Sequence, residues 1–170
     1  MSLHHLLTRR EAVALGLGAA ALAVTVKLAL GGDGAAAVAA TPASLKLSDA
    51  EWRKRLRPDA YRVLRQADTE RPFSSPLNDE HRGGTFACAG CGLPLYASRT
   101  KFDSGTGWPS FYDHLPNAIG ERKDATLGEE RTEVHCARCA GHLGHVFDDG
   151  PKPTGLRYCM NGVAMRFTPA

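Results

Sequence analysis

The chain has 170 residues, of which 43% are hydrophobic and 23% charged, the proportions of a globular protein. This length suits one ordinary domain and leaves little room for a second. The formal net charge is only +3, which argues against a nucleic-acid-binding protein.

Residues 1–40 have the composition of an export signal. Arg9 and Arg10 precede an apolar stretch from Ala12 to Val26, and small residues fill positions 35–40. These are the three parts of a secretory signal, and the paired arginines resemble the twin-arginine signal, which is read by a pathway for folded proteins. We therefore predict a twin-arginine signal peptide over residues 1–40, with export to the periplasm or another extracytoplasmic compartment.

The same segment has an alternative interpretation as an uncleaved membrane anchor. Its uninterrupted apolar run covers about 15 residues, whereas a membrane span needs roughly 20. We therefore expect cleavage near Ala39 or Ala40, and no stable membrane association afterwards.

Two short helices are predicted near the start of the mature chain, which we take as residues 41–170. Ser48 and Glu51 have the spacing of a capping box, so one helix should begin there. Pro58 suits the first turn of a second helix, with Tyr61 and Leu64 on one face.

From residue 71 onward glycine and proline recur every few residues, with short apolar or aromatic runs between them. Such runs predict short antiparallel strands joined by turns. They cover residues 84–87, 95–96, 133–135, 145–147 and 162–167. The predicted fold class is mainly β or α+β, with one domain over residues 41–170.

Four of the five cysteines form two C-x-x-C pairs, Cys88 with Cys91 and Cys136 with Cys139. Each pair places two sulfurs on one tight turn, and two pairs can complete a tetrahedral thiolate shell. We predict one structural Zn²⁺ ion, with no open position for activating water. Two disulfide bridges, common in exported proteins, and a redox-active C-x-x-C are the alternatives.

The fifth cysteine, Cys159, is the candidate nucleophile. On a strand, Arg157, Cys159 and Asn161 would point to one face. A guanidinium beside a thiol favours the thiolate. A buried structural cysteine is the alternative, but the polar neighbours argue against it.

Two histidines and an aromatic loop supply further candidates. His142 and His145, set among glycines, are interpreted as an acid–base pair that Asp148 or Asp149 could orient. Trp108 follows a glycine-rich turn and could wall an apolar pocket, although it could equally belong to the core.

Together these motifs resemble the methionine-R-sulfoxide reductase (MsrB) family. The resemblance is carried by residues 47–52, 69–73, the two cysteine pairs, and residues 101–111, 141–147 and 157–161. It implies two antiparallel sheets in a tent-like β core, short N-terminal helices, and structural zinc at an edge away from the active site.

The resemblance also implies a role for each matching residue. It makes Cys159 the nucleophile, supported by Arg157 and Asn161, while His142 and His145 bind and protonate the sulfoxide oxygen. Trp108 accepts the substrate methyl group, and Phe111 is a further substrate-binding candidate.

The implied reaction reduces methionine R-sulfoxide in oxidised proteins or peptides, and leaves Cys159 as a sulfenic acid. Many family members carry a resolving cysteine where this chain has Thr106. We therefore predict a one-cysteine cycle in which a thioredoxin-like donor or a small thiol restores Cys159. A monomer is expected.

Two other functions stay open at this point. A zinc-knuckle binding module would explain the four paired cysteines, but not Cys159 or the histidines. A cysteine hydrolase would use Cys159 with His145 and an aspartate, but it needs an oxyanion hole for which the sequence has no clear signature.

Overall fold

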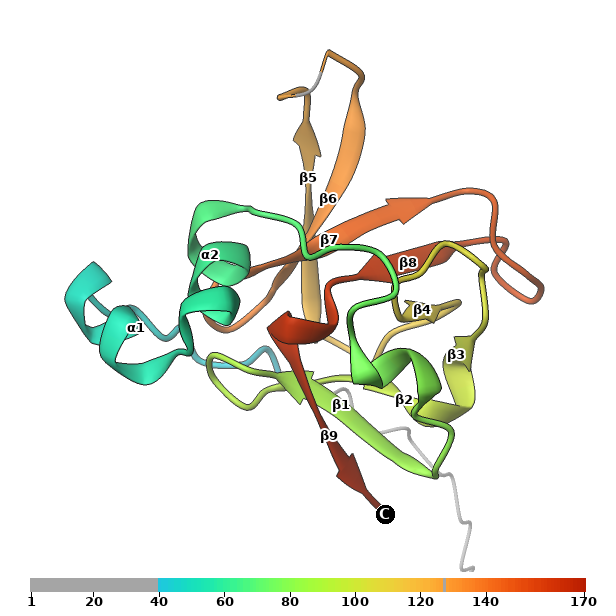
Figure 1. Ribbon diagram of the computed structural model, residues 1–170, viewed down its shortest axis with the longest axis horizontal. Helices are drawn as coiled ribbons and strands as arrows, with labels where there is room; N and C mark the ends of the chain where they lie inside the picture. Colours follow the sequence, from blue (N-terminus) through green and yellow to red (C-terminus); the bar gives the residue numbers. More distant parts are fainter. Residues whose placement is uncertain (1–39, 127) are drawn as a thin grey trace, which may run out of the picture. The chain divides into compact units, whose positions relative to one another are not determined.

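A computed structural model describes residues 40–126 and 128–170 (Figure 1). The predicted twin-arginine signal, apart from its last residue, lies outside this described part. Among the described residues, no helix combines the length and the apolar character that a membrane crossing requires.

Two short helices open the described chain, as predicted. Helix α1 (Asp49–Arg55) begins with a capping box, in which the Ser48 amide donates to the Glu51 carboxylate at 2.8 Å and the Ser48 hydroxyl accepts from the Glu51 amide. Helix α2 (Pro58–Gln66) begins at the proline and buries one face that includes Tyr61 and Leu64. It packs against the strand that carries the histidines.

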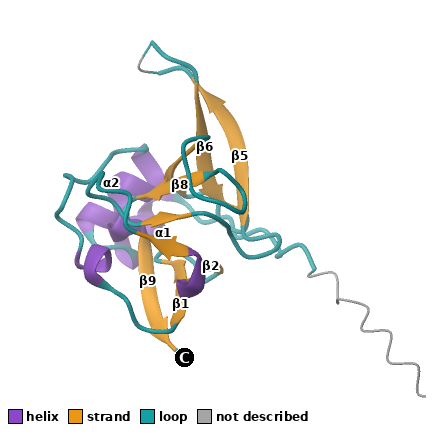
Figure 2. Ribbon diagram, turned by 90° about the vertical axis from the view of Figure 1, so that its right-hand side faces the viewer, coloured by secondary structure: helices purple, strands orange, loops and turns teal. Residues whose placement is uncertain are grey.

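The strands form two antiparallel sheets, which confirms the predicted mainly β architecture. The smaller sheet has the order β2 (Pro94–Ala97), β1 (Gly84–Cys88), β9 (Met165–Pro169). The larger has the order β3 (Lys101–Phe102), β4 (Ser110–Phe111), β8 (Arg157–Met160), β7 (His142–Phe147), β6 (Arg131–Cys136), β5 (Ile119–Asp124). Figure 2 shows the two helices gathered on one side of these strands.

The described residues include three single-turn 3-10 helices: η1 (Pro76–Asp79) precedes β1, η2 (Ser98–Thr100) connects β2 to β3, and η3 (Gly162–Ala164) connects β8 to β9. The last of them corrects the prediction of a strand over residues 162–167, because strand β9 begins only at Met165. The Glu70 carboxylate accepts the amides of Gly162 and Val163 at 2.6 and 3.0 Å. These bonds hold the turn in which the chain passes from the larger sheet to the smaller.

Aromatic side chains fill the core. The Phe111 ring stacks on Tyr96 at 4.3 Å and meets the edge of Phe86 at 5.0 Å. The Tyr96 hydroxyl lies 3.1 Å from the Met160 sulfur, which joins the smaller sheet to β8. Strand β8, which carries Cys159, is therefore fixed from the core side.

Strands β5 and β6 form a long hairpin that extends away from the remaining strands in Figure 1. Its last register pair before the tip is Asp124 with Arg131, whose side chains form an ion pair at 2.8 Å. Through these two residues the hairpin reaches the neighbourhood of His145 and Cys159.

Candidate active site

The Cys159 side chain lines a small hollow of about 140 Å³. The lining comes from three strands and three loop segments: Thr69, Trp108, Arg131, Gly144, His145, Phe147, Cys159 and Asn161. A nucleophilic sulfur, an imidazole, an indole and a carboxamide thus surround one space. Of the seven catalytic or substrate-binding residues predicted from the sequence, four line this hollow: Trp108, His145, Cys159 and Asn161. The other three, His142, Arg157 and Phe111, do not line it.

The register of the strands explains this selection. In an antiparallel pair, residues directly opposite each other project to the same face. Cys159 pairs with Ser110 on one side and with His145 on the other. Phe111 pairs with Tyr158 and therefore projects to the opposite face, where it is fully buried in the core.

Close approach of β7 and β8 depends on Gly144. A Cβ atom at this position would lie 2.1 Å from the Cys159 carbonyl oxygen, far inside any normal contact. Only glycine lets the two backbones come this close. The glycine beside the histidines is therefore needed to place Cys159.

The Cys159 thiol is half-buried, and burial raises its pKa above the ordinary value. The Thr106 hydroxyl, 3.9 Å from the sulfur, and the Arg157 guanidinium act in the opposite direction, but their effects are smaller. Arg157 thus acts on the pKa of Cys159 in the direction expected from the sequence, but burial outweighs it. Arg157 is also bound to the Asp149 carboxylate through two bonds of 2.8 Å.

A bulge in β7 brings the two histidines to one face. Three residues apart on a regular strand, they would point to opposite faces. The β6–β7 register shifts between Val134 and His135, so one extra β7 residue is accommodated. The rings of His142 and His145 lie 5.4 Å apart, edge to face.

Each histidine has its own carboxylate. Nδ1 of buried His142 lies 2.7 Å from Glu133, which also accepts from Arg122, and burial lowers the pKa of His142. Nε2 of His145 lies 2.7 Å from Asp124, and only His145 lines the hollow.

The orienting carboxylates were not those proposed from the sequence. Asp149 is bound to Arg157, and Asp124 and Glu133 hold the imidazoles. Glu133 is 9 positions from His142, and Asp124 is 21 positions from His145. Only the strand register brings each carboxylate to its histidine.

Residue 70 links the two walls of the hollow. The Glu70 carbonyl accepts the indole N–H of Trp108 at 3.1 Å, and its amide donates to the Asn161 side chain at 2.9 Å. The Asn161 amide group donates in turn to the Leu143 carbonyl at 3.0 Å. The motif at residues 69–73 thus fixes the aromatic and the polar wall together, a role that the sequence did not reveal.

The four paired cysteines meet in a separate cluster, at the turns that follow β1 and β6. Their sulfurs all lie within 4.8 Å of one another. Cys88 and Cys139 are 3.7 Å apart, and Cys91 and Cys136 are 3.5 Å apart. A disulfide needs about 2.05 Å, so the predicted alternative of two bridges is not what the structure contains, and the cluster is a candidate metal centre.

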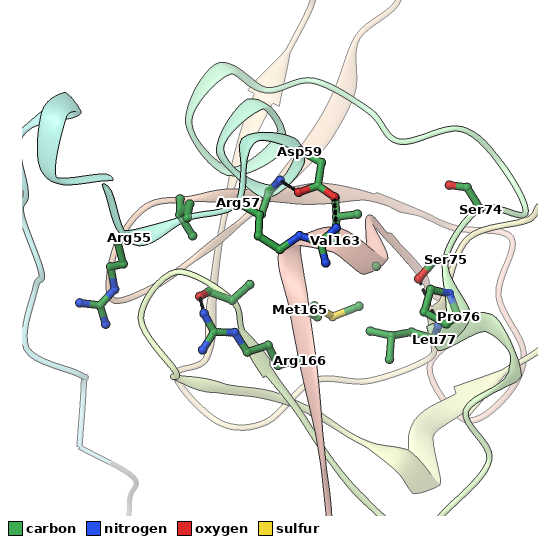
Figure 3. A pocket seen from close by; sticks show the side chains of 14 residues that line it. Arg55, Arg57, Asp59, Ser74, Ser75, Pro76, Leu77, Val163, Met165 and Arg166 are labelled. Atoms are coloured by element: carbon green, nitrogen blue, oxygen red, sulfur yellow. Dashed lines mark hydrogen bonds and ion pairs between the residues drawn. The ribbon is translucent and has the colours of Figure 1, made fainter. Parts of the chain in front are cut away.

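A larger hollow of about 410 Å³ lies between the start of α2, η1 and β9 (Figure 3). Three arginines line it, but each is already bonded: Arg57 to Asp59, and Arg55 and Arg166 to the carbonyls of Gly90 and Ala89. Its lining contains no cysteine or histidine.

Comparison with known proteins identifies the family of the chain. The SelR domain matches residues 56–169. "Peptide methionine sulfoxide reductase MsrB" of Thiobacillus denitrificans is 55% identical over 123 residues, covering 72% of this chain and 93% of that protein. Proteins of the same name from Agrobacterium fabrum and Leifsonia xyli are 52% and 56% identical, over 76% and 72% of this chain and 96% and 89% of theirs. The chain belongs to the SelR domain family.

Proposed function

We propose that this protein reduces the R epimer of methionine sulfoxide in peptides and proteins to methionine, with Cys159 as the nucleophile. The observation that carries the proposal is one small hollow in which Cys159, His145, Trp108 and Asn161 meet. The names of the MsrB relatives support the same activity. They do not favour the zinc-knuckle module or the cysteine hydrolase.

The reaction suits these groups. The Cys159 sulfur attacks the sulfoxide sulfur, the S–O bond of the substrate breaks, and the oxygen ends on Cys159 as a sulfenic acid while methionine leaves. The thiol proton and the oxygen must be brought together, and an imidazole near the reacting atoms can transfer that proton. His145 lines the hollow and is the candidate for this transfer, with Asp124 holding its ring.

Stereospecificity follows from two unlike walls. The substrate methyl group would lie against the Trp108 indole, and the oxygen against the polar side formed by His145 and Asn161. The S epimer would exchange these contacts and leave polar groups unpaired, which costs more than a lost apolar contact.

Return to the thiol requires an external reductant. Thr106 is the residue whose side chain faces the Cys159 sulfur from the loop, and it has no thiol. The other four cysteines are gathered in their own cluster. Two equivalents of a thiol donor, such as one thioredoxin-like dithiol, would convert the sulfenic acid to Cys159 thiol and water.

The cysteine cluster fits one structural zinc ion. Zinc–thiolate bonds of about 2.3 Å in a tetrahedron place the sulfurs about 3.8 Å apart. The observed separations of 3.5 and 3.7 Å agree with this geometry. Cys88, Cys91, Cys136 and Cys139 would hold the ion, which would stabilise the fold and supply no step of the reaction.

The proposal also includes three further points: export by the twin-arginine signal, a tent-like arrangement of the two sheets, and a monomeric state.

The test offers dabsyl-methionine R- and S-sulfoxides with dithiothreitol to the wild type and to Cys159→Ser. We expect turnover of the R epimer alone, and its complete loss in the variant. Turnover of both epimers, or activity that survives in Cys159→Ser, would refute the proposal. Hydrolysis of an acyl ester by the wild type, without sulfoxide turnover, would favour a hydrolase.

A further inference from the structure

Phe73 is an unusual residue on the surface of the described chain. Its side chain is 75% exposed, and it is the single large hydrophobic residue of the described part with such exposure. Scattered exposed apolar residues are ordinary and need no explanation by themselves. Phe73 differs because its backbone is also strained.

The backbone of Phe73 has a φ of +61°, in the left-handed region. This region is a genuine outlier for a bulky aromatic residue. Strained backbones of this kind gather at binding sites, where the surrounding structure enforces them. Here the Phe73 amide donates to the Gly107 carbonyl at 2.7 Å, and the Ser74 hydroxyl closes a turn onto the Arg71 carbonyl at 2.6 Å.

The Phe73 ring lies directly against the Trp108 loop. A Cβ at Gly107, whose φ is +91°, would be 2.9 Å from two ring carbons of Phe73. The Asn78 amide group donates to the same Gly107 carbonyl at 3.0 Å. One side of the ring is therefore supported by the loop, and the remainder is presented to solvent.

A second hollow, of about 180 Å³, lies beside this ring on the other side of the Trp108 indole from the candidate active site. Phe73 and Trp108 both line it, together with Phe102, Lys101 and Asp103 among others. Trp108 also lines the hollow that contains Cys159. The indole is thus a shared wall between the reacting sulfur and the surface that carries Phe73.

We infer that Phe73 and this second hollow bind the residue next to the oxidised methionine in a peptide, with preference for an apolar side chain. The inference rests on the proposed function. An extended peptide whose sulfoxide lies beside Trp108 continues over the loop, where the exposed ring offers an apolar contact. Free methionine sulfoxide has no neighbouring residue and does not reach Phe73.

The test compares three R-sulfoxide substrates, all with dithiothreitol: N-acetylmethionine sulfoxide and two pentapeptides that differ only in having Leu or Ser beside the sulfoxide. We expect the wild type to favour the Leu peptide by about tenfold in kcat/KM, equivalent to about 1.4 kcal/mol. Phe73→Ala should reduce this preference to within twofold, and leave kcat/KM for N-acetylmethionine sulfoxide within twofold of wild type.

Two further variants separate the ring from the strain. Phe73→Gly relieves the left-handed backbone and should lose the preference as Phe73→Ala does, whereas Phe73→Leu should keep part of it. Tyr112→Ala removes a half-exposed aromatic residue that lines neither hollow and should behave as wild type.

Each remaining outcome overturns the inference. An equal loss on all three substrates would make Phe73 a support for the Trp108 loop only. An unchanged preference in Phe73→Ala would exclude recognition by the ring. A defect seen only when thioredoxin replaces dithiothreitol would assign the ring to the protein donor. Wild type without activity on any R-sulfoxide would refute the proposed function itself.

Discussion

Replacing Gly144 by alanine tests how closely β7 and β8 must approach. The new Cβ would lie 2.1 Å from the Cys159 carbonyl oxygen, about 1.3 Å short of the 3.4 Å at which ordinary contact begins. Met160 Cα and Cε, each 3.0 Å away, prevent an easy sidestep. Strand β8 therefore has to move by about an ångström, and Cys159 moves with it.

Overpacking of this kind costs about 1–3 kcal/mol, and one lost ladder hydrogen bond adds about 0.5–1.5 kcal/mol. We therefore expect Gly144→Ala to lower the free energy of unfolding by about 2–4 kcal/mol. A displacement of about 1 Å at a reacting group costs on the order of 10²-fold in rate, so kcat for the R-sulfoxide should fall by a similar factor.

Urea unfolding and steady-state kinetics measure the two effects. The matched control is Gly83→Ala, where a Cβ would meet nothing within 4 Å. We expect it to have wild-type stability and activity. If Gly144→Ala were as stable and active as the control, the close approach of the strands would not position Cys159, and the reasoning would fail.

Three further predictions follow from the same contacts. Thr106→Cys should form a disulfide with Cys159 during turnover, visible by mass spectrometry without reductant, because residue 106 already faces that sulfur at 3.9 Å. Burial lowers the pKa of His142 in the folded state, so stability should decline as pH falls below the unfolded value of about 6.5. The decline, followed by thermal melts between pH 7.5 and 5, should be shallower in His142→Gln. Chelation of zinc should lower Tm by more than about 10 °C, because structural zinc contributes many kcal/mol to folding, and metal analysis should give one ion per chain in wild type and none in Cys88→Ser.

Local patterns in the sequence predicted the parts of the fold that depend on neighbours in the chain. The capping box at Ser48 and the proline at position 58 place the helix starts where the structure has them. The two C-x-x-C pairs predicted a four-sulfur cluster, because each turn brings two sulfurs together and the strands β1 and β6 bring the turns together.

Features that depend on strand register were beyond the sequence. Phe111 and Ser110 are adjacent, and only the pairing with β8 decides which of them faces Cys159. The bulge in β7 reverses the face of His142, and Gly144 beside it is only a weak signal of it, since glycine inside a strand can mark either a bulge or a close backbone approach. Asp124 is 21 positions from His145 and reaches it only across the β5–β6 hairpin.

The cysteine cluster and the candidate active site share strands, which gives the metal centre an indirect role. Cys136 ends β6, and Cys139 stands three residues before His142 at the start of β7. The same two strands carry Glu133 and the bulge that aligns the histidines. Strand β8 is also held from outside these two strands, by the pairing of Cys159 with Ser110 on β4 and by the contact of the Tyr96 hydroxyl with the Met160 sulfur. Loss of the ion would therefore displace the histidine rings before it displaced the Cys159 sulfur. Partial metal removal should accordingly slow sulfoxide reduction more than it slows alkylation of Cys159 by iodoacetamide.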